Sequence, residues 1–171
     1  FVVAGTMLLT VAIWHYKMVF ITYGKASLLL RYLMFATTIL IAFLIFTGSL
    51  GLKWYFGIPD SNFIIAIFAS SFLLFYQSLF HRDFVNIKSL LFVLLGAIIV
   101  ALGGYFVTWY GTVNFYSAGM LLAGIAYTYW GLFLLHLTKK LTFRQVAEHA
   151  WVMVFVLLYV LATTNFSARI G

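Results

Sequence analysis

The side chains best suited to chemistry in this sequence are four histidines: His15, His81, His136 and His149. Haem b in a helical bundle needs two axial histidines on facing helices at a similar depth. His15 and His149 meet that criterion best, because both are expected to lie within about two turns of the inner boundary of the membrane. They are therefore candidate haem ligands. The alternative is that these histidines are simply hydrated near a membrane surface, since the ligand spacings His-xxx-His and Glu-xx-His do not occur.

Glu148 is the acidic residue that lies inside a long apolar segment, and Arg144 precedes it by four positions. Residues four apart on a helix are neighbours on its surface, so this spacing predicts an ion pair. Ionisable groups at membrane depth are costly and usually functional. We interpret the pair as structural and close to the interface. A role in proton uptake, or contact with a neighbouring chain, is the alternative.

Other catalytic chemistry finds little support in the sequence. The chain contains no cysteine, which excludes disulfides, thiolate metal sites and cysteine nucleophiles. It shows no glycine-rich phosphate loop, no serine–histidine–acid spacing and no paired intramembrane carboxylates. We therefore expect no catalytic residues of its own, and leave open whether it serves an enzyme complex. The net charge of +7 does not indicate a nucleic-acid partner, because the basic residues sit in short connectors between apolar runs.

Composition indicates the elements that would position these groups. The 171 residues are 65% hydrophobic and only 8% charged, whereas a soluble domain carries about 25% charged residues. Lipid must therefore be the solvent, and runs of about 20 apolar residues predict spanning helices. We predict an all-α polytopic transmembrane bundle in one domain (1–171), with six spans at 1–21, 28–50, 62–80, 87–110, 115–137 and 145–166. The chain begins inside an apolar run without a methionine, which predicts that residues precede Phe1.

Charge and local signals indicate the topology and the helix ends. Eight of the ten lysines and arginines follow spans one, three and five, whereas Lys53 and Arg169 lie on the other side. This alternation predicts that both termini are on the outer side. Pro59 and Asn114 each mark the start of a helix. Small residues at helical spacing predict close helix packing at Ala66-xxx-Ser70, Ala97-xxx-Ala101 and Gly119-xxx-Ala123.

The order of features in the last five spans resembles subunit III of the haem–copper (cytochrome c oxidase-type) respiratory oxidases, in a degenerate short form. Residues 30–36 are similar to that family's basic residue and Met-containing helix, and residues 56–63, with Pro59, to the proline-containing entry into its next helix. Residues 130–132, which include Gly131, fall where the family has Gly-Gly-Leu. In residues 143–151, Glu148 replaces the family's aspartate and Trp151 matches its later tryptophan.

The resemblance implies an accessory subunit without a redox centre of its own. Such a subunit packs against other integral membrane subunits of a respiratory complex and holds phospholipid. Gln145 stands where the family has a histidine, and the intramembrane glutamate of longer members is missing, so the resemblance does not extend to proton collection. The implied location is the bacterial inner membrane or the mitochondrial inner membrane.

Two other functions remain open from the residues. One is a transmembrane sensory or regulatory domain of a signalling protein, which residues beyond either end of the chain would support. The other is a haem b-binding electron carrier that uses His15 and His149. A small transporter is a further alternative, but no substrate site suggests itself in the sequence.

Overall fold

The protein is a bundle of long helices, known here from a computed structural model that describes residues 28–80, 86–110, 114–139 and 141–163. The helices are α2 (Leu28–Phe56), α3 (Asp60–Phe80), α4 (Ile87–Tyr110), α5 (Phe115–Leu137) and α6 (Phe143–Thr163). All five are long and apolar enough to cross a membrane. The described residues thus make an all-α integral membrane protein with five candidate spans. The first of the six predicted spans, 1–21, lies outside the described residues.

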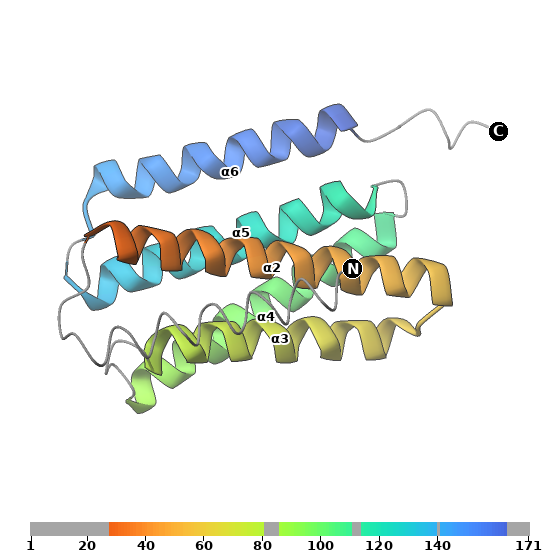
Figure 1. The fold of residues 1–171 in the computed structure, drawn as a ribbon, viewed down its shortest axis with the longest axis horizontal. Coiled ribbons are helices and arrows are strands. Elements are labelled where there is room, and N and C mark those ends of the chain that lie inside the picture. Colours follow the sequence, from red (N-terminus) through yellow and green to blue (C-terminus); the bar gives the residue numbers. More distant parts are fainter. Residues whose placement is uncertain (1–27, 81–85, 111–113, 140, 164–171) are drawn as a thin grey trace.

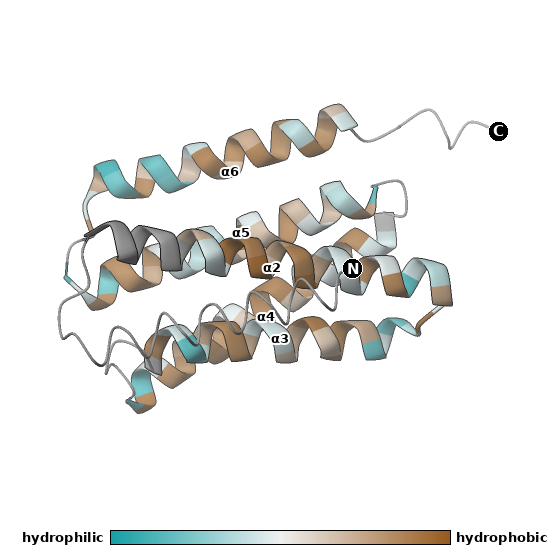
Figure 2. Ribbon diagram, viewed as in Figure 1, coloured by the Kyte–Doolittle hydropathy of each residue, from teal (hydrophilic) through white to brown (hydrophobic). Residues whose placement is uncertain are grey.

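Successive helices run in opposite directions, as their short connectors require (Figure 1). Brown apolar residues dominate the middle of each described helix and teal polar residues lie toward the ends, as expected for spans in lipid (Figure 2). Helix α5 has the central position and packs against α2, α4 and α6, while α3 packs against α4 and α2. Helix α6 lies at one edge, where its extensive contact is with α5.

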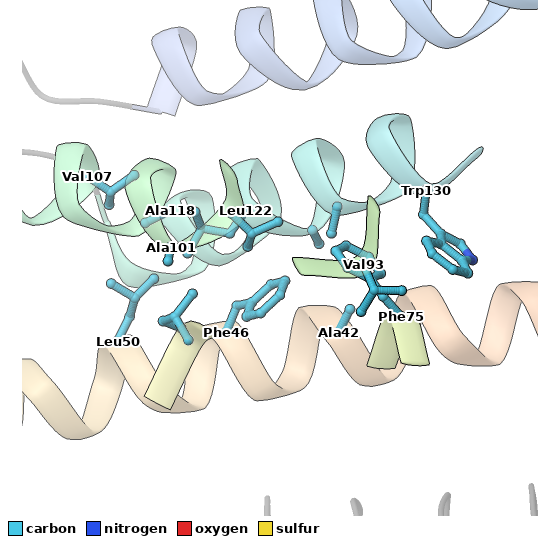
Figure 3. Packing of buried hydrophobic residues seen from close by; sticks show 14 of the residues in the cluster. Ala42, Phe46, Leu50, Phe75, Val93, Ala101, Val107, Ala118, Leu122 and Trp130 are labelled. Carbon is cyan, nitrogen blue, oxygen red and sulfur yellow. The ribbon is translucent and has the colours of Figure 1, made fainter. Parts of the chain in front are cut away.

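The core lies where α2, α3, α4 and α5 meet, and large apolar side chains fill it (Figure 3). Phe46 and Leu122 are fully buried there. Phe75 of α3 stacks on Trp130 of α5 with ring centroids 5.0 Å apart and planes 8° apart. The indole Nε1 of Trp130 donates a hydrogen bond of 2.9 Å to Ser78 Oγ. This bond satisfies the polar side-chain atom of a buried tryptophan. Together with the ring stacking, the bond fixes α5 against α3.

Helix α2 extends to Phe56, six residues beyond the predicted end, because no residue breaks the helix before Gly57. Gly57 adopts a left-handed backbone (φ 63°), and the N–H of Ile58 bonds to the carbonyl of Lys53 at 3.2 Å. This is a Schellman termination, in which glycine avoids the cost of a Cβ. Lys53 also forms an ion pair with Asp60 at the start of α3. The predicted long connector 51–61 was therefore wrong, and the turn covers only residues 57–59.

Asparagine and threonine side chains begin three of the helices. Asn114 accepts a hydrogen bond from the N–H of Tyr116 at 3.2 Å, so this predicted helix start is present. Asn86 similarly accepts one from the N–H of Ser89 at 2.8 Å. Thr142 and Gln145 form a reciprocal capping box, with Thr142 N–H bonded to Gln145 Oε1 and Gln145 N–H to Thr142 Oγ1. Helix α6 therefore begins at Phe143, two residues before the predicted start, and is described as far as Thr163. The predicted residues 164–166 lie outside the described part of the chain.

Two of the three small-residue faces lie at helix contacts. Ala97 and Ala101 are buried. Gly119 lies against Thr47 of α2 so closely that a Cβ there would be 2.9 Å from the Thr47 Cα. The third face is different, because Ala66 is exposed and Ser70 half-buried on α3. That part of the packing prediction was wrong within the described bundle.

Candidate functional site

Two of the predicted site residues, Gly131 and His149, meet at the junction between α5 and α6. Helix α6 approaches α5 at glycines, where backbones come close. A Cβ built on Gly124 would lie 3.2 Å from Cγ1 of Val156, and one built on Gly131 would collide with the ring of His149. Gly131 and His149, which are eighteen positions apart in the chain, are therefore direct neighbours.

His149 is seated by three contacts. Its ring stacks on Tyr127 of α5, with centroids 5.2 Å apart and planes 14° apart. Its Nδ1 lies 2.9 Å from the carbonyl oxygen of Gln145. Because a carbonyl only accepts, Nδ1 carries a proton and donates this hydrogen bond. The edge of the ring that bears Nε2 faces Gly131. The imidazole thus acts as the side chain that fills the gap over a glycine.

This arrangement does not fit a haem held by two histidines within the described bundle. Both ring nitrogens of His149 face protein groups, as the contacts above show. His136 lies against Phe92 of α4, at 6.2 Å between ring centroids. His136 and Tyr127 are nine positions apart, and at about 100° per residue this places them on opposite sides of α5. His15, the other candidate, and His81 lie outside the described residues. Among the residues that the structure covers, no group of three metal-ligating side chains occurs.

Arg144 and Glu148 lie on α6 outside its buried contact with α5. The expected ion pair is present, with Arg144 Nε 3.1 Å from Glu148 Oε1. The two side chains remain 89% and 59% exposed. An exposed pair with this spacing stabilises a helix in water by only about 0.3–0.5 kcal/mol. Its placement away from the bundle is therefore more informative than its contribution to stability.

Large apolar side chains continue from the ion pair along the same side of α6. Trp151, Phe155 and Leu158 are 62%, 67% and 56% exposed. Their spacing of four and three residues keeps them, together with Arg144 and Glu148, within about 80° around the helix axis. We call these five residues the exposed face of α6. Only Val156 and Val160 of this helix are buried, on the side toward α5.

Pro59 lies at the opposite end of the bundle from the start of α6 with its Arg144–Glu148 pair (Figure 1). It occupies the turn between α2 and α3, and its carbonyl oxygen accepts the first hydrogen bond of α3, from the N–H of Phe63 at 3.1 Å. The ammonium of Lys53 lies 5.6 Å from the centre of the Phe63 ring. Pro59 is therefore a structural residue of the turn, remote from the α5–α6 junction.

Tyr127 and Ser71 were not among the predicted site residues. Tyr127 sits between His149 and a cavity enclosed by α2, α3 and α5, and Ser71 lines the same cavity. The pair of hydroxyls at Ser70 and Ser71, in the middle of an apolar helix, was the available signal for Ser71. Nothing in the sequence distinguished Tyr127 from the other tyrosines. No protein-family model, curated protein or solved structure matches the chain.

Proposed function

We propose that this chain is a non-catalytic integral membrane subunit of a respiratory electron-transfer complex, similar to subunit III of the haem–copper oxidases. It packs against the catalytic subunit through the exposed face of α6 and binds membrane phospholipid. The observation that carries this proposal is the position of the Arg144–Glu148 pair and Trp151 on a helix that has one extensive neighbour among the described helices.

Lipid alone accommodates apolar side chains but not charged ones. Glu148 is the sixth residue of α6, about 8 Å along the helix at 1.5 Å per residue. An ionised carboxylate that faces hydrocarbon is costly, even when it is paired. A neighbouring protein helix with hydrogen-bonding groups at this depth would lower that cost. The bulky aromatic side chains next to the pair are of the kind that anchors protein interfaces.

The resemblance to subunit III adds independent support. In the last helix it rests on Glu148 and Trp151, and both of these residues lie on the exposed face of α6. Gly131, where the family has its Gly-Gly-Leu, instead supports the contact between α5 and α6. The residues of the resemblance therefore divide into a set that attaches α6 to the bundle and a set that faces outward.

The proposed topology places the end of the bundle with Lys88, Lys139 and Arg144 on the inner side of the membrane. These residues lie at the start of α4, just after α5 and at the start of α6. Lys53 lies at the other end, near the end of α2. The positive-inside rule assigns the end with more lysine and arginine residues to the inner side of the membrane. The membrane would be a bacterial or mitochondrial inner membrane, with both termini outside.

Co-purification tests the proposed function. The tagged full chain, solubilised in a mild detergent, should elute with larger membrane subunits and with a haem Soret band. Trp151→Ala and Phe155→Ala should each release much of the haem from the eluate. Leu73→Ala is the matched control, because Leu73 is 63% exposed on α3, away from the exposed face of α6. It should leave the haem content unchanged.

A chain that purifies alone and colourless would contradict the proposal. So would haem that stays with the chain in the Trp151 and Phe155 variants but is lost in the Leu73 variant. A haem signal that persists after every other subunit has been removed would instead support the electron-carrier alternative. A kinase or cyclase domain in the same open reading frame would favour the sensory alternative.

A further inference from the structure

A small cavity lies between α2, α3 and α5, near the middle of the described helices. Its volume is about 30 Å³, and it is partly open to the surroundings. Its walls are almost entirely apolar and include Ala42 and Phe46 of α2, Phe75 of α3, and Ala126 and Trp130 of α5. Figure 3 shows Phe46, Phe75 and Trp130 converging from these three helices. The stacked rings of Phe75 and Trp130 give the cavity one rigid wall.

Ser71 contributes a buried hydroxyl to this apolar site. The residue is fully buried, it lines the cavity, and its Oγ has no hydrogen-bond partner. A serine in a helix usually avoids this state by bonding to a carbonyl of the preceding turn. The neighbouring Ser70 does so, with its Oγ 2.8 Å from the Ala66 carbonyl oxygen and 3.1 Å from that of Ile67. The carbonyl of Ile67 is also the i−4 acceptor that Ser71 would use. Ser71 is thus the lining side chain with an unfilled hydrogen-bonding capacity.

We propose that this cavity binds the end of an unbranched apolar molecule that carries one neutral oxygen, such as a straight-chain alcohol, with Ser71 as the hydrogen-bonding partner. The volume limits what enters. A cavity of about 150 Å³ holds benzene, with six carbon atoms, so about 30 Å³ holds only one or two non-hydrogen atoms. The hydroxyl and its carbon occupy the enclosed space, and the rest of the chain lies through the opening. A charged headgroup does not suit such walls, because burying an unpaired charge among them is too costly. The inference goes beyond the proposed function and does not depend on it.

Photolabelling of the full chain in membranes tests this site. The probe is an eight-carbon straight-chain alcohol with a diazirine on its third carbon, so that the ring lies at the opening of the cavity and not in the enclosed space. Labelled residues are mapped by mass spectrometry. Label should appear on the cavity walls, chiefly at Phe75 and Trp130. An excess of 1-octanol should protect these positions, whereas n-octane should protect them much less. Label spread over other faces, or equal protection by the alkane, would overturn the proposal.

Two serine variants separate a hydrogen bond from general partitioning of the probe into lipid. Ser71→Ala should raise the probe concentration for half-maximal labelling by about two- to tenfold, the range expected for one neutral hydrogen bond. Ser70→Ala is the matched control, because its hydroxyl is already bonded within α3. It should leave the labelling curve unchanged. Ser71→Ala removes an unpaired buried hydroxyl, so its melting temperature should not fall. An unchanged labelling curve for a folded Ser71→Ala protein would refute the role of Ser71.

Discussion

Helix α6 is attached to the bundle by a histidine packed over a glycine, and Gly131→Ala should weaken that attachment. The new Cβ would lie 2.7 Å from Cδ2 of His149. The ring cannot retreat easily, since Tyr127 stacks on it and Gln145 holds Nδ1. Overpacking of this kind costs about 1–3 kcal/mol. Alanine also gains about 1 kcal/mol in helix propensity over glycine, and this gain must be removed from the comparison.

Gly51→Ala is the control that removes the gain in helix propensity from the comparison. Gly51 also lies inside a helix, but a Cβ there would meet its nearest atom, Cδ2 of Phe115, at 4.0 Å. The difference between the two variants is then the overpacking cost alone. At about 2–4 °C per kcal/mol for a protein of this size, Gly131→Ala should melt about 2–12 °C below Gly51→Ala.

Thermal unfolding of the full chain in detergent, followed by tryptophan fluorescence, measures this difference. His149→Ala adds a second arm, since removal of the ring should leave room for the methyl group introduced by Gly131→Ala. Gly131→Ala should therefore cost much less in the His149→Ala background than alone, with a coupling energy of at least about 1 kcal/mol. Equal melting temperatures for Gly131→Ala and Gly51→Ala would refute the reasoning. A coupling energy near zero would show that His149 is not the obstacle.

Three further predictions follow from the bundle. Gly119→Ala should destabilise the protein at least as much as Gly131→Ala. Adding Thr47→Ala should not restore the lost stability, because the new Cβ would also lie 2.9 Å from the backbone Cα of Thr47. The melting temperatures of the single and double variants check this. Asp60→Asn should lower the melting temperature slightly, by the equivalent of about 1 kcal/mol or less, because Lys53 loses its ion-pair partner while Asp60 is 62% exposed. Because the chain has no cysteine, Lys53→Cys and Lys139→Cys are single labelling sites. A membrane-impermeant maleimide added to sealed vesicles of one orientation should label one of them, and the other only after the membrane is opened.

Much of the architecture could be predicted from composition and local signals. A chain with 8% charged residues has to place its apolar runs in lipid, and a helix satisfies the hydrogen bonds of the backbone within each run of about 20 residues. The bounds of α4 and α5 matched the prediction because Asn86 and Asn114 cap the helix starts with their own side chains. The end of α2 was missed because the helix does not stop where the apolar run does but continues past Lys53 to the left-handed Gly57.

The candidate site was harder to predict from the sequence than the fold, because the helices are surrounded by lipid and not by water. In water, the apolar stripe of a helix marks its buried side, but in lipid both sides are apolar, and sequence periodicity no longer distinguishes them. Arg144 and Glu148 could be paired from their spacing alone, yet only the contact of α6 with α5 decided that the pair faces away from the bundle. In the same way, Ser70 and Ser71 are alike in sequence. Packing against α2 and α5 buried the second hydroxyl in a cavity and left the first bonded to its own helix.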